Sequence, residues 1–127
     1  MTRFRYRPHQ HLRSSADFDR VFREGSRARS GIMMVAVAEN GLAHSRLGLS
    51  VGKRIWKSAV KRNYIRRVFR EAFRLEQYSL PPGLDIILVP AQPRLVPELE
   101  ATRQELVAMT RKALRRFLEK RDGGAAK

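Results

Sequence analysis

Short blocks of apolar residues alternate with charged ones along the chain, and their spacing predicts alternating helices and strands. The first block, "SSADFDRVFREG" at 14–25, predicts a short helix because its two phenylalanines recur four positions apart. Ser14 and Asp17 have the spacing of a capping box, and Gly25 is a typical helix stop. An N-terminal helix is therefore expected.

Three further blocks have β character. The runs 32–38 and 45–51 flank Asn40-Gly41, a strong turn signal, so they predict a hairpin. "LDIILVP" at 84–90 is continuously apolar and bounded by turn residues, which predicts a buried strand. "SRARSG", just before the first run, is the candidate for a fourth strand.

Two longer helices complete the order. The central one begins near Trp56–Ser58 and ends at about Gln77, because "SLPPG" cannot continue it. Pro97 suits the first position of a last, amphipathic helix.

The order α-β-β-β-α-β-α predicts a small α+β fold with one sheet. We expect a single domain at 14–120, a basic flexible arm at 1–13 and a flexible tail at 121–127.

The central helix divides its side chains between two faces at 100° per residue. The apolar arc, expected to face the core, contains Val60, Tyr64, Ile65, Val68, Phe69, Ala72, Phe73 and Leu75. The opposite side gathers Asn63, Arg66, Arg67, Arg70 and Arg74, with Arg62 at its edge. Lys61 falls within the apolar arc, where its ammonium would snorkel or point into a cleft shared with the sheet. Like charges at this spacing repel, so a bound polyanion is favoured over an ordinary solvated face.

Composition points the same way. The 127 residues include 27 Lys and Arg against 12 Asp and Glu, a net charge of +15. Arginine predominates, and its guanidinium grips phosphates bidentately, which favours nucleic acid as the partner. With no cysteine, disulfides, thiol catalysis and Cys-ligated zinc are excluded. No apolar run is long enough to cross a bilayer, and no hydrophobic signal core begins the chain. We expect a cytoplasmic protein with no membrane partner.

The sequence offers no catalytic constellation. His9, His11 and His44 have no plausible partner nearby in sequence, and Asp17 and Asp19 diverge on a helix. P-loop, HExxH and GxSxG motifs are absent. The chain is therefore interpreted as a binder, with no catalytic residues and no metal ligands of its own.

Two other groups have open interpretations. In "LGLSVGKRIWKSAV", Lys53, Arg54 and Lys57 stand at a Gly-flanked strand-to-helix junction that suits phosphate binding, although Gly52 could merely relieve a tight turn. Phe18 and Phe22 share a helical face, where they either belong to the core or stack on unpaired bases.

Residues 47–74, "LGLSVGKRIWKSAVKRNYIRRVFREAFR", resemble the signature of the bacterial ribonuclease P protein component. The N-terminal segment with Phe18 and Phe22 and the late strand "LDIILVPAQP" also resemble that family, so the similarity covers about 12–94. One departure is Arg62-Asn63-Tyr64, where the family has Arg-Asn-Arg; the helical wheel places Tyr64 on the inner arc.

The resemblance implies a mixed four-stranded sheet with a left-handed βαβ crossover, similar to the ribosomal protein S5 domain 2-like fold. It implies a subunit of a tRNA 5′-maturation endonuclease, in which a large RNA performs the hydrolysis with Mg²⁺ bound mainly through RNA. The implied contacts to that RNA are Arg62, Asn63, Arg66, Arg67 and Arg70. The implied contacts to the 5′ leader of precursor tRNA are Phe18, Phe22, Lys53, Arg54, Lys57 and Lys61.

The alternative is a ribosomal or rRNA-assembly protein with no role in cleavage, since its charge and fold could be the same. A DNA-binding architectural protein is disfavoured because no helix-turn-helix pattern or dimer seam is visible, and no DNA partner is expected.

Overall fold

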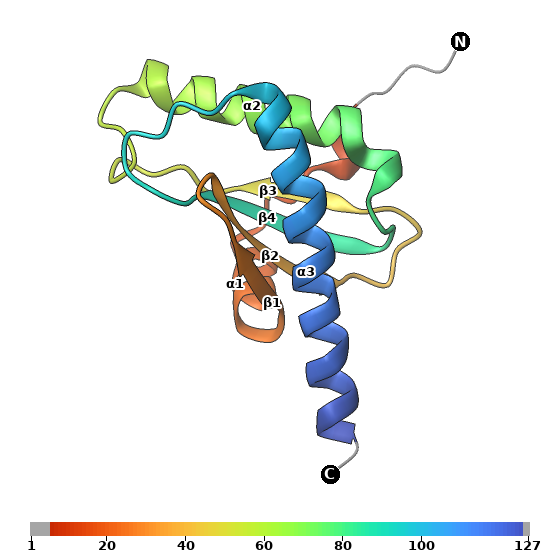
Figure 1. The fold of residues 1–127 in the computed structure, drawn as a ribbon. Helices are drawn as coiled ribbons and strands as arrows, with labels where there is room; N and C mark the ends of the chain where they lie inside the picture. Colours follow the sequence, from red (N-terminus) through yellow and green to blue (C-terminus); the bar gives the residue numbers. More distant parts are fainter. Residues whose placement is uncertain (1–5, 126–127) are drawn as a thin grey trace.

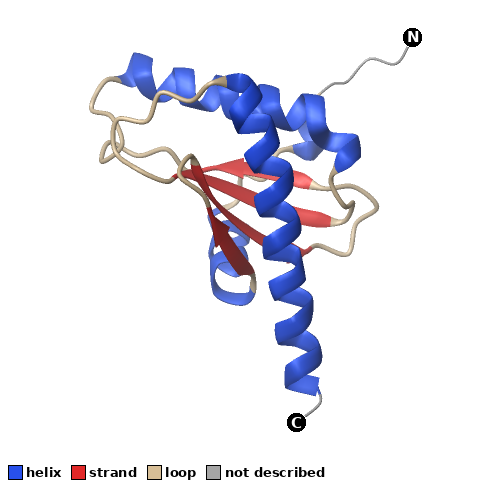
Figure 2. Ribbon diagram, in the orientation of Figure 1, coloured by secondary structure: helices blue, strands red, loops and turns tan. Residues whose placement is uncertain are grey.

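A four-stranded sheet carries two helices on one face and one on the other (Figures 1 and 2). The structure, a computed structural model, describes residues 6–125. Its elements are η1 (Pro8–Gln10), α1 (Ser15–Glu24), β1 (Ser26–Arg29), β2 (Met33–Glu39), β3 (Arg46–Leu49), α2 (Ala59–Glu76), η2 (Gln77–Ser79), β4 (Leu84–Pro90) and α3 (Leu99–Ala125). The predicted element order, and the fourth strand in "SRARSG", are confirmed.

The strands lie in the order β1-β2-β4-β3, which makes the predicted pairing of the second and third strands wrong. Seven residues of β2 pair antiparallel with β4, and β3 pairs parallel with the other side of β4. The reason is burial: β4 is buried on both faces and takes a central place in the sheet. Asn40-Gly41 does turn the chain, with Gly41 at φ 73°, but the strand after the turn, β3, pairs with β4 and not with β2.

The mixed sheet expected from the resemblance is confirmed. The parallel strands β3 and β4 are joined through α2, which makes a βαβ crossover. That this crossover is left-handed stays a prediction.

Helices α2 and α3 cover one face of the sheet, and α1 covers part of the other (Figure 1). The larger core lies under α2 and α3 and includes Met33, Ile86, Phe69 and Phe73. A smaller core, with Val21 and Ile87, lies under α1. Capping agrees with the sequence: the hydroxyl oxygens of Ser14 and Ser58 accept backbone N–H bonds at the starts of α1 and α2.

The apolar arc of α2 is buried only in part. Ile65, Val68 and Phe69 are buried as expected, whereas Val60 is 76% exposed and Tyr64 40% exposed. The first turns of α2 lie against the 95–97 segment instead of the sheet, and the Tyr64 hydroxyl donates to the Pro97 carbonyl at 3.1 Å. Placing these two side chains in the core was therefore wrong.

Both ends of the domain differ from the expected boundaries. Residues 6–13, expected in a flexible arm, contact the domain: His11 bridges to Leu47, and Leu12 is buried. The last helix begins at Leu99, two residues after Pro97, and continues to Ala125 through part of the expected tail. The expectations for 1–5 and 126–127 lie outside the described residues. Within 6–125, no helix is long and apolar enough to cross a membrane.

Candidate nucleic-acid interface

The predicted arginine face of α2 contains two kinds of side chain. Arg62 donates to the carbonyls of Trp56 and Lys57, both at 2.8 Å. Arg66 donates to Asn63 Oδ1 at 2.8 Å and to the Val51 carbonyl at 3.1 Å. These two arginines hold the β3–α2 loop, and each keeps further N–H groups for a ligand.

Arg67 and Arg70 are exposed, and neither forms a hydrogen bond or ion pair with any residue in 6–125. The nearby acid does not compensate them, because Glu71 is bonded to Arg74. That hydrogen bond is the main cause of the lowered pKa of Glu71. Two arginines with uncompensated charge are thus presented to solvent on one helix.

The N-terminal segment extends this surface beside Arg70. Tyr6 stacks on His11 with ring centroids 3.9 Å apart and donates its hydroxyl to the Leu47 carbonyl at 3.1 Å. Burial raises the pKa of Tyr6 to about 12 against the opposing charges of Arg70 and Arg13. The pKa of His11 is lowered, first by burial and then by the same two arginines. The charges of Arg13 and Arg70 thus add to burial in disfavouring the protonated form of His11.

The two phenylalanines lie on the opposite face of the sheet. Phe18 and Phe22 are both half-buried, with ring centroids 6.4 Å apart. Phe18 lies over Gly48, where an added Cβ would come within 2.5 Å of its ring. The Arg27 guanidinium lies 5.2 Å from the Phe22 centroid. Each ring thus packs against the small core and is partly exposed, while its stacking on unpaired bases stays a prediction.

Asp85 holds this face together and was missed by the sequence reasoning, which treated its strand as apolar. The carboxylate is fully buried and accepts from Arg46 at 2.8 and 2.7 Å, from Asn40 at 3.0 Å and from Arg20. Burial alone would raise the pKa of Asp85, but the hydrogen bonds from Arg46 and Asn40 and the arginine charges lower it. The one available signal was a charge inside a buried strand.

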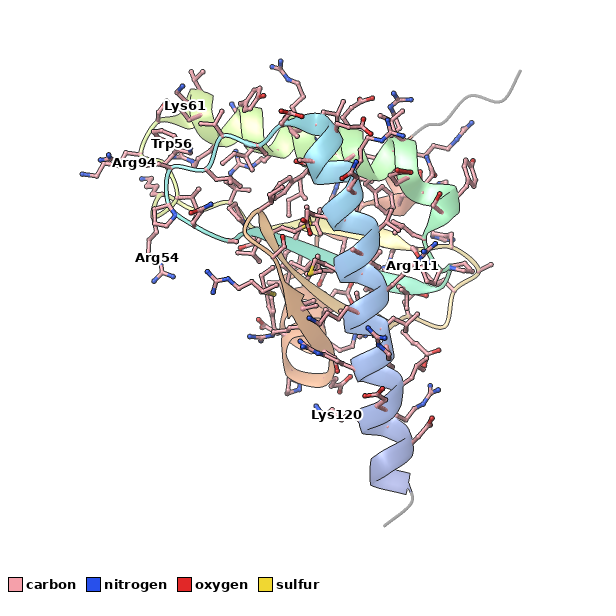
Figure 3. All side chains as sticks on the ribbon, viewed as in Figure 1. Arg54, Trp56, Lys61, Arg94, Arg111 and Lys120 are labelled. Atoms are coloured by element: carbon pink, nitrogen blue, oxygen red, sulfur yellow. The ribbon has the colours of Figure 1, made fainter. Side chains whose placement is uncertain are left out.

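Lys53, Arg54 and Lys57 line a hollow of about 540 Å³ at the start of α2. Trp56 also lines it, and Lys61 lies over the Trp56 ring at 5.5 Å from its centroid. Arg94, from the segment after β4, adds a cation that sequence spacing could not place (Figure 3).

Neither phenylalanine lines this hollow, so the residues implied for the leader fall on two surfaces. We name them the α1 face (Phe18, Phe22 and the uncovered sheet beside them) and the loop surface (Lys53, Arg54, Trp56, Lys57, Lys61 and Arg94).

In the part of the chain that the structure describes, no three acids or histidines lie close enough together to hold a metal ion. His9 and His44, distant in sequence, do meet edge to face with centroids 4.8 Å apart. Both are near the surface, and His44 Nε2 is 3.2 Å from the His9 carbonyl oxygen.

The family model for ribonuclease P matches residues 6–117, which include α1, the whole sheet and the arginine face. The chain belongs to the ribonuclease P protein family. The ribonuclease P protein component of Syntrophobacter fumaroxidans is 50% identical over 86 residues, 67% of this chain and 71% of that protein. That of Chromobacterium violaceum is 40% identical over 88 residues, 69% of this chain and 72% of that protein.

Solved ribonuclease P proteins share the fold. The Staphylococcus aureus protein superposes with a TM-score of 0.71 at 30% identity, covering 82% of this chain and 94% of that one. The Thermotoga maritima protein gives 0.71 at 29% identity, with 80% and 96% covered. As a ribonuclease P protein component, the chain is a subunit in tRNA 5′ processing.

Proposed function

We propose that the chain binds the ribonuclease P RNA through the arginine face of α2: Arg62, Asn63, Arg66, Arg67 and Arg70. The observation that carries the proposal is the exposure of Arg67 and Arg70 with no partner in 6–125. A rigid helix bearing such guanidiniums suits the phosphates of a structured RNA, because the side chains are already held at fixed spacing. Arg62 and Arg66 keep the adjoining loop in place.

The 5′ leader of precursor tRNA binds the α1 face. A single strand has unstacked bases, and the partly exposed side chains of Phe18 and Phe22 offer aromatic surface on which bases can stack. Lys53, Arg54, Lys57 and Lys61 of the loop surface contact phosphates where the leader passes the end of β3. The two RNAs thus approach opposite faces of the domain.

Hydrolysis belongs to the RNA subunit in this proposal. Any Mg²⁺ that the reaction requires is held mainly by RNA. The protein supplies positive charge and position: it lowers the repulsion between two polyanions and holds the leader beside the catalytic RNA. We place the assembly in the cytoplasm.

The test is the salt dependence of binding to the folded RNA subunit. Arg67→Ala with Arg70→Ala should make the slope of log K against log salt shallower by about 1.4–1.8, since each lost phosphate contact contributes about 0.7–0.9. Arg7→Ala with Arg23→Ala removes equal charge from exposed arginines outside α2 and should change the slope less. Equal slopes for the two variants would refute binding through the arginine face.

A further inference from the structure

An apolar hollow adjoins the arginine face at the start of α2. Val60, Lys61, Tyr64, Leu95 and Val96 line about 210 Å³. Val60 is 76%, Val96 62% and Tyr64 40% exposed. Five large hydrophobic side chains are exposed among the described residues, and three of them meet here. Such a cluster on an otherwise charged protein marks an interaction site.

Cationic side chains lie in the wall of the hollow and beside it. Lys61 forms part of its wall and lies over the Trp56 ring. Arg54, Trp56, Lys61 and Arg94 lie near one another at this end of the molecule (Figure 3). No acidic residue lines either the apolar hollow or the larger one beside it. The occupant must therefore combine an apolar group with negative charge.

The walls of the hollow are fixed before any ligand arrives. The Tyr64 hydroxyl bonds the Pro97 carbonyl at 3.1 Å, and Trp56 Nε1 bonds the Leu95 carbonyl at 2.8 Å. The backbone N–H of Arg94 donates to the Ile55 carbonyl at 2.7 Å. These bonds join the 94–97 segment to α2 and its preceding loop, so binding requires little ordering.

We propose that the hollow takes the base of one unpaired nucleotide of the ribonuclease P RNA, with a flanking phosphate on Arg94. A base has a flat ring to place against Tyr64 and Val60, and its phosphates provide the charge. The hollow is smaller than the roughly 300–1,000 Å³ of drug-sized sites, which suits a single ring system. A second copy of the chain carries the same +15 charge and would be repelled.

Helix geometry assigns the nucleotide to the RNA subunit. Asn63 and Arg67 follow Val60 and Tyr64 by three residues, so they are their neighbours on the helix surface. An RNA docked on the arginine face therefore reaches the hollow without crossing the domain. This inference rests on the proposed function, since it names a further contact of the same RNA.

The experiment measures binding of the full chain to the folded RNA subunit over a range of salt. Val60→Ser with Val96→Ser removes the exposed apolar surface and should weaken binding about 3- to 10-fold at every salt concentration. The slope against log salt should not change, because no phosphate contact is lost. Thermal stability should stay within a few degrees, since both side chains are exposed. Leu42→Ser, at an exposed leucine outside both hollows, should leave binding unchanged.

Unchanged affinity in the double variant would overturn the inference. So would a loss seen only with leader-bearing precursor tRNA in the holoenzyme, because the hollow would then serve the leader. A loss equal to that of Leu42→Ser would mean that the apolar surface acts nonspecifically. If the unmodified chain does not bind the RNA subunit, the proposed function itself fails, and the inference fails with it.

Discussion

Replacing Asp85 with Asn should destabilise the domain more than any other single change of charge on the α1 face. The carboxylate has no exposed surface and lies opposite Arg46 across the parallel pair of β3 and β4. It also binds Arg20 from α1 and Asn40 from the turn after β2. Its loss therefore affects the attachment of α1, the edge strand and the turn at once.

Breaking a buried ion pair costs about 3–5 kcal/mol. We expect the low end, about 3 kcal/mol, because the Arg46 and Arg20 side chains are 23% and 27% exposed and can regain water. For a domain of this size, that loss lowers the melting temperature by roughly 10 °C. Asp17→Asn is the matched control: Asp17 faces the same arginines at 3.7 and 3.8 Å, but it is 33% exposed and should cost under about 1 kcal/mol.

The effect should depend on pH with a definite sign. The pKa of Asp85 is lowered in the folded state, so its ionised form stabilises the fold above the unfolded pKa of about 3.9. This stabilisation is lost as the pH falls through the folded pKa. Urea unfolding at pH 7 and in acid should show a large difference between wild type and Asp85→Asn that shrinks on acidification. A variant within about 1 kcal/mol of wild type at pH 7 would refute the reasoning.

Three more predictions concern the two RNA surfaces. Phe18→Ala should weaken holoenzyme binding of precursor tRNA with a leader by about 1–3 kcal/mol and leave mature tRNA unaffected; equal losses in a gel-shift titration would show a core role instead. Gly48→Ala should mimic it in the same titration, since the added methyl displaces the Phe18 ring, and a normal leader affinity would argue against that ring as the contact. RNA phosphates at Arg70 should offset the cation that helps to lower the pKa of His11. Binding should therefore raise that pKa, take up a proton and tighten as the pH falls below about 6.5; an unmoved His11 resonance in NMR would contradict this.

The elements were predictable because their signals are local. Ser14, Ser58 and Gly25 mark helix ends through bonds to residues three or four away. The run 84–90, apolar except for Asp85, identified β4 to the residue. Strand pairing was not predictable from the same signals, because the order β1-β2-β4-β3 depends on which strand needs two covered faces. A turn at Asn40-Gly41 is compatible with either arrangement.

The candidate site likewise contains residues that the sequence could place and residues that it could not. The arginine face follows from helical periodicity alone, and Arg67 and Arg70 lie exposed as it requires. Periodicity also placed Tyr64 inward, but a helical wheel does not show where the supporting sheet ends. Asp85 bonds to Arg46 and Arg20, which are 39 and 65 residues away in the sequence. Arg94 and Trp56 line one hollow but come from separate loops. No spacing rule links such residues.

We propose above all that this chain lets a catalytic RNA act on leader-bearing precursor tRNA. Multiple-turnover cleavage of precursor tRNA by the ribonuclease P RNA, at low Mg²⁺, with and without the chain, tests it most directly. Cleavage at the 5′ end of the mature tRNA should be strongly stimulated by the chain, and the stimulation should fall with Arg67→Ala and Arg70→Ala together. An RNA whose turnover and Mg²⁺ requirement are the same with and without the chain would contradict the account.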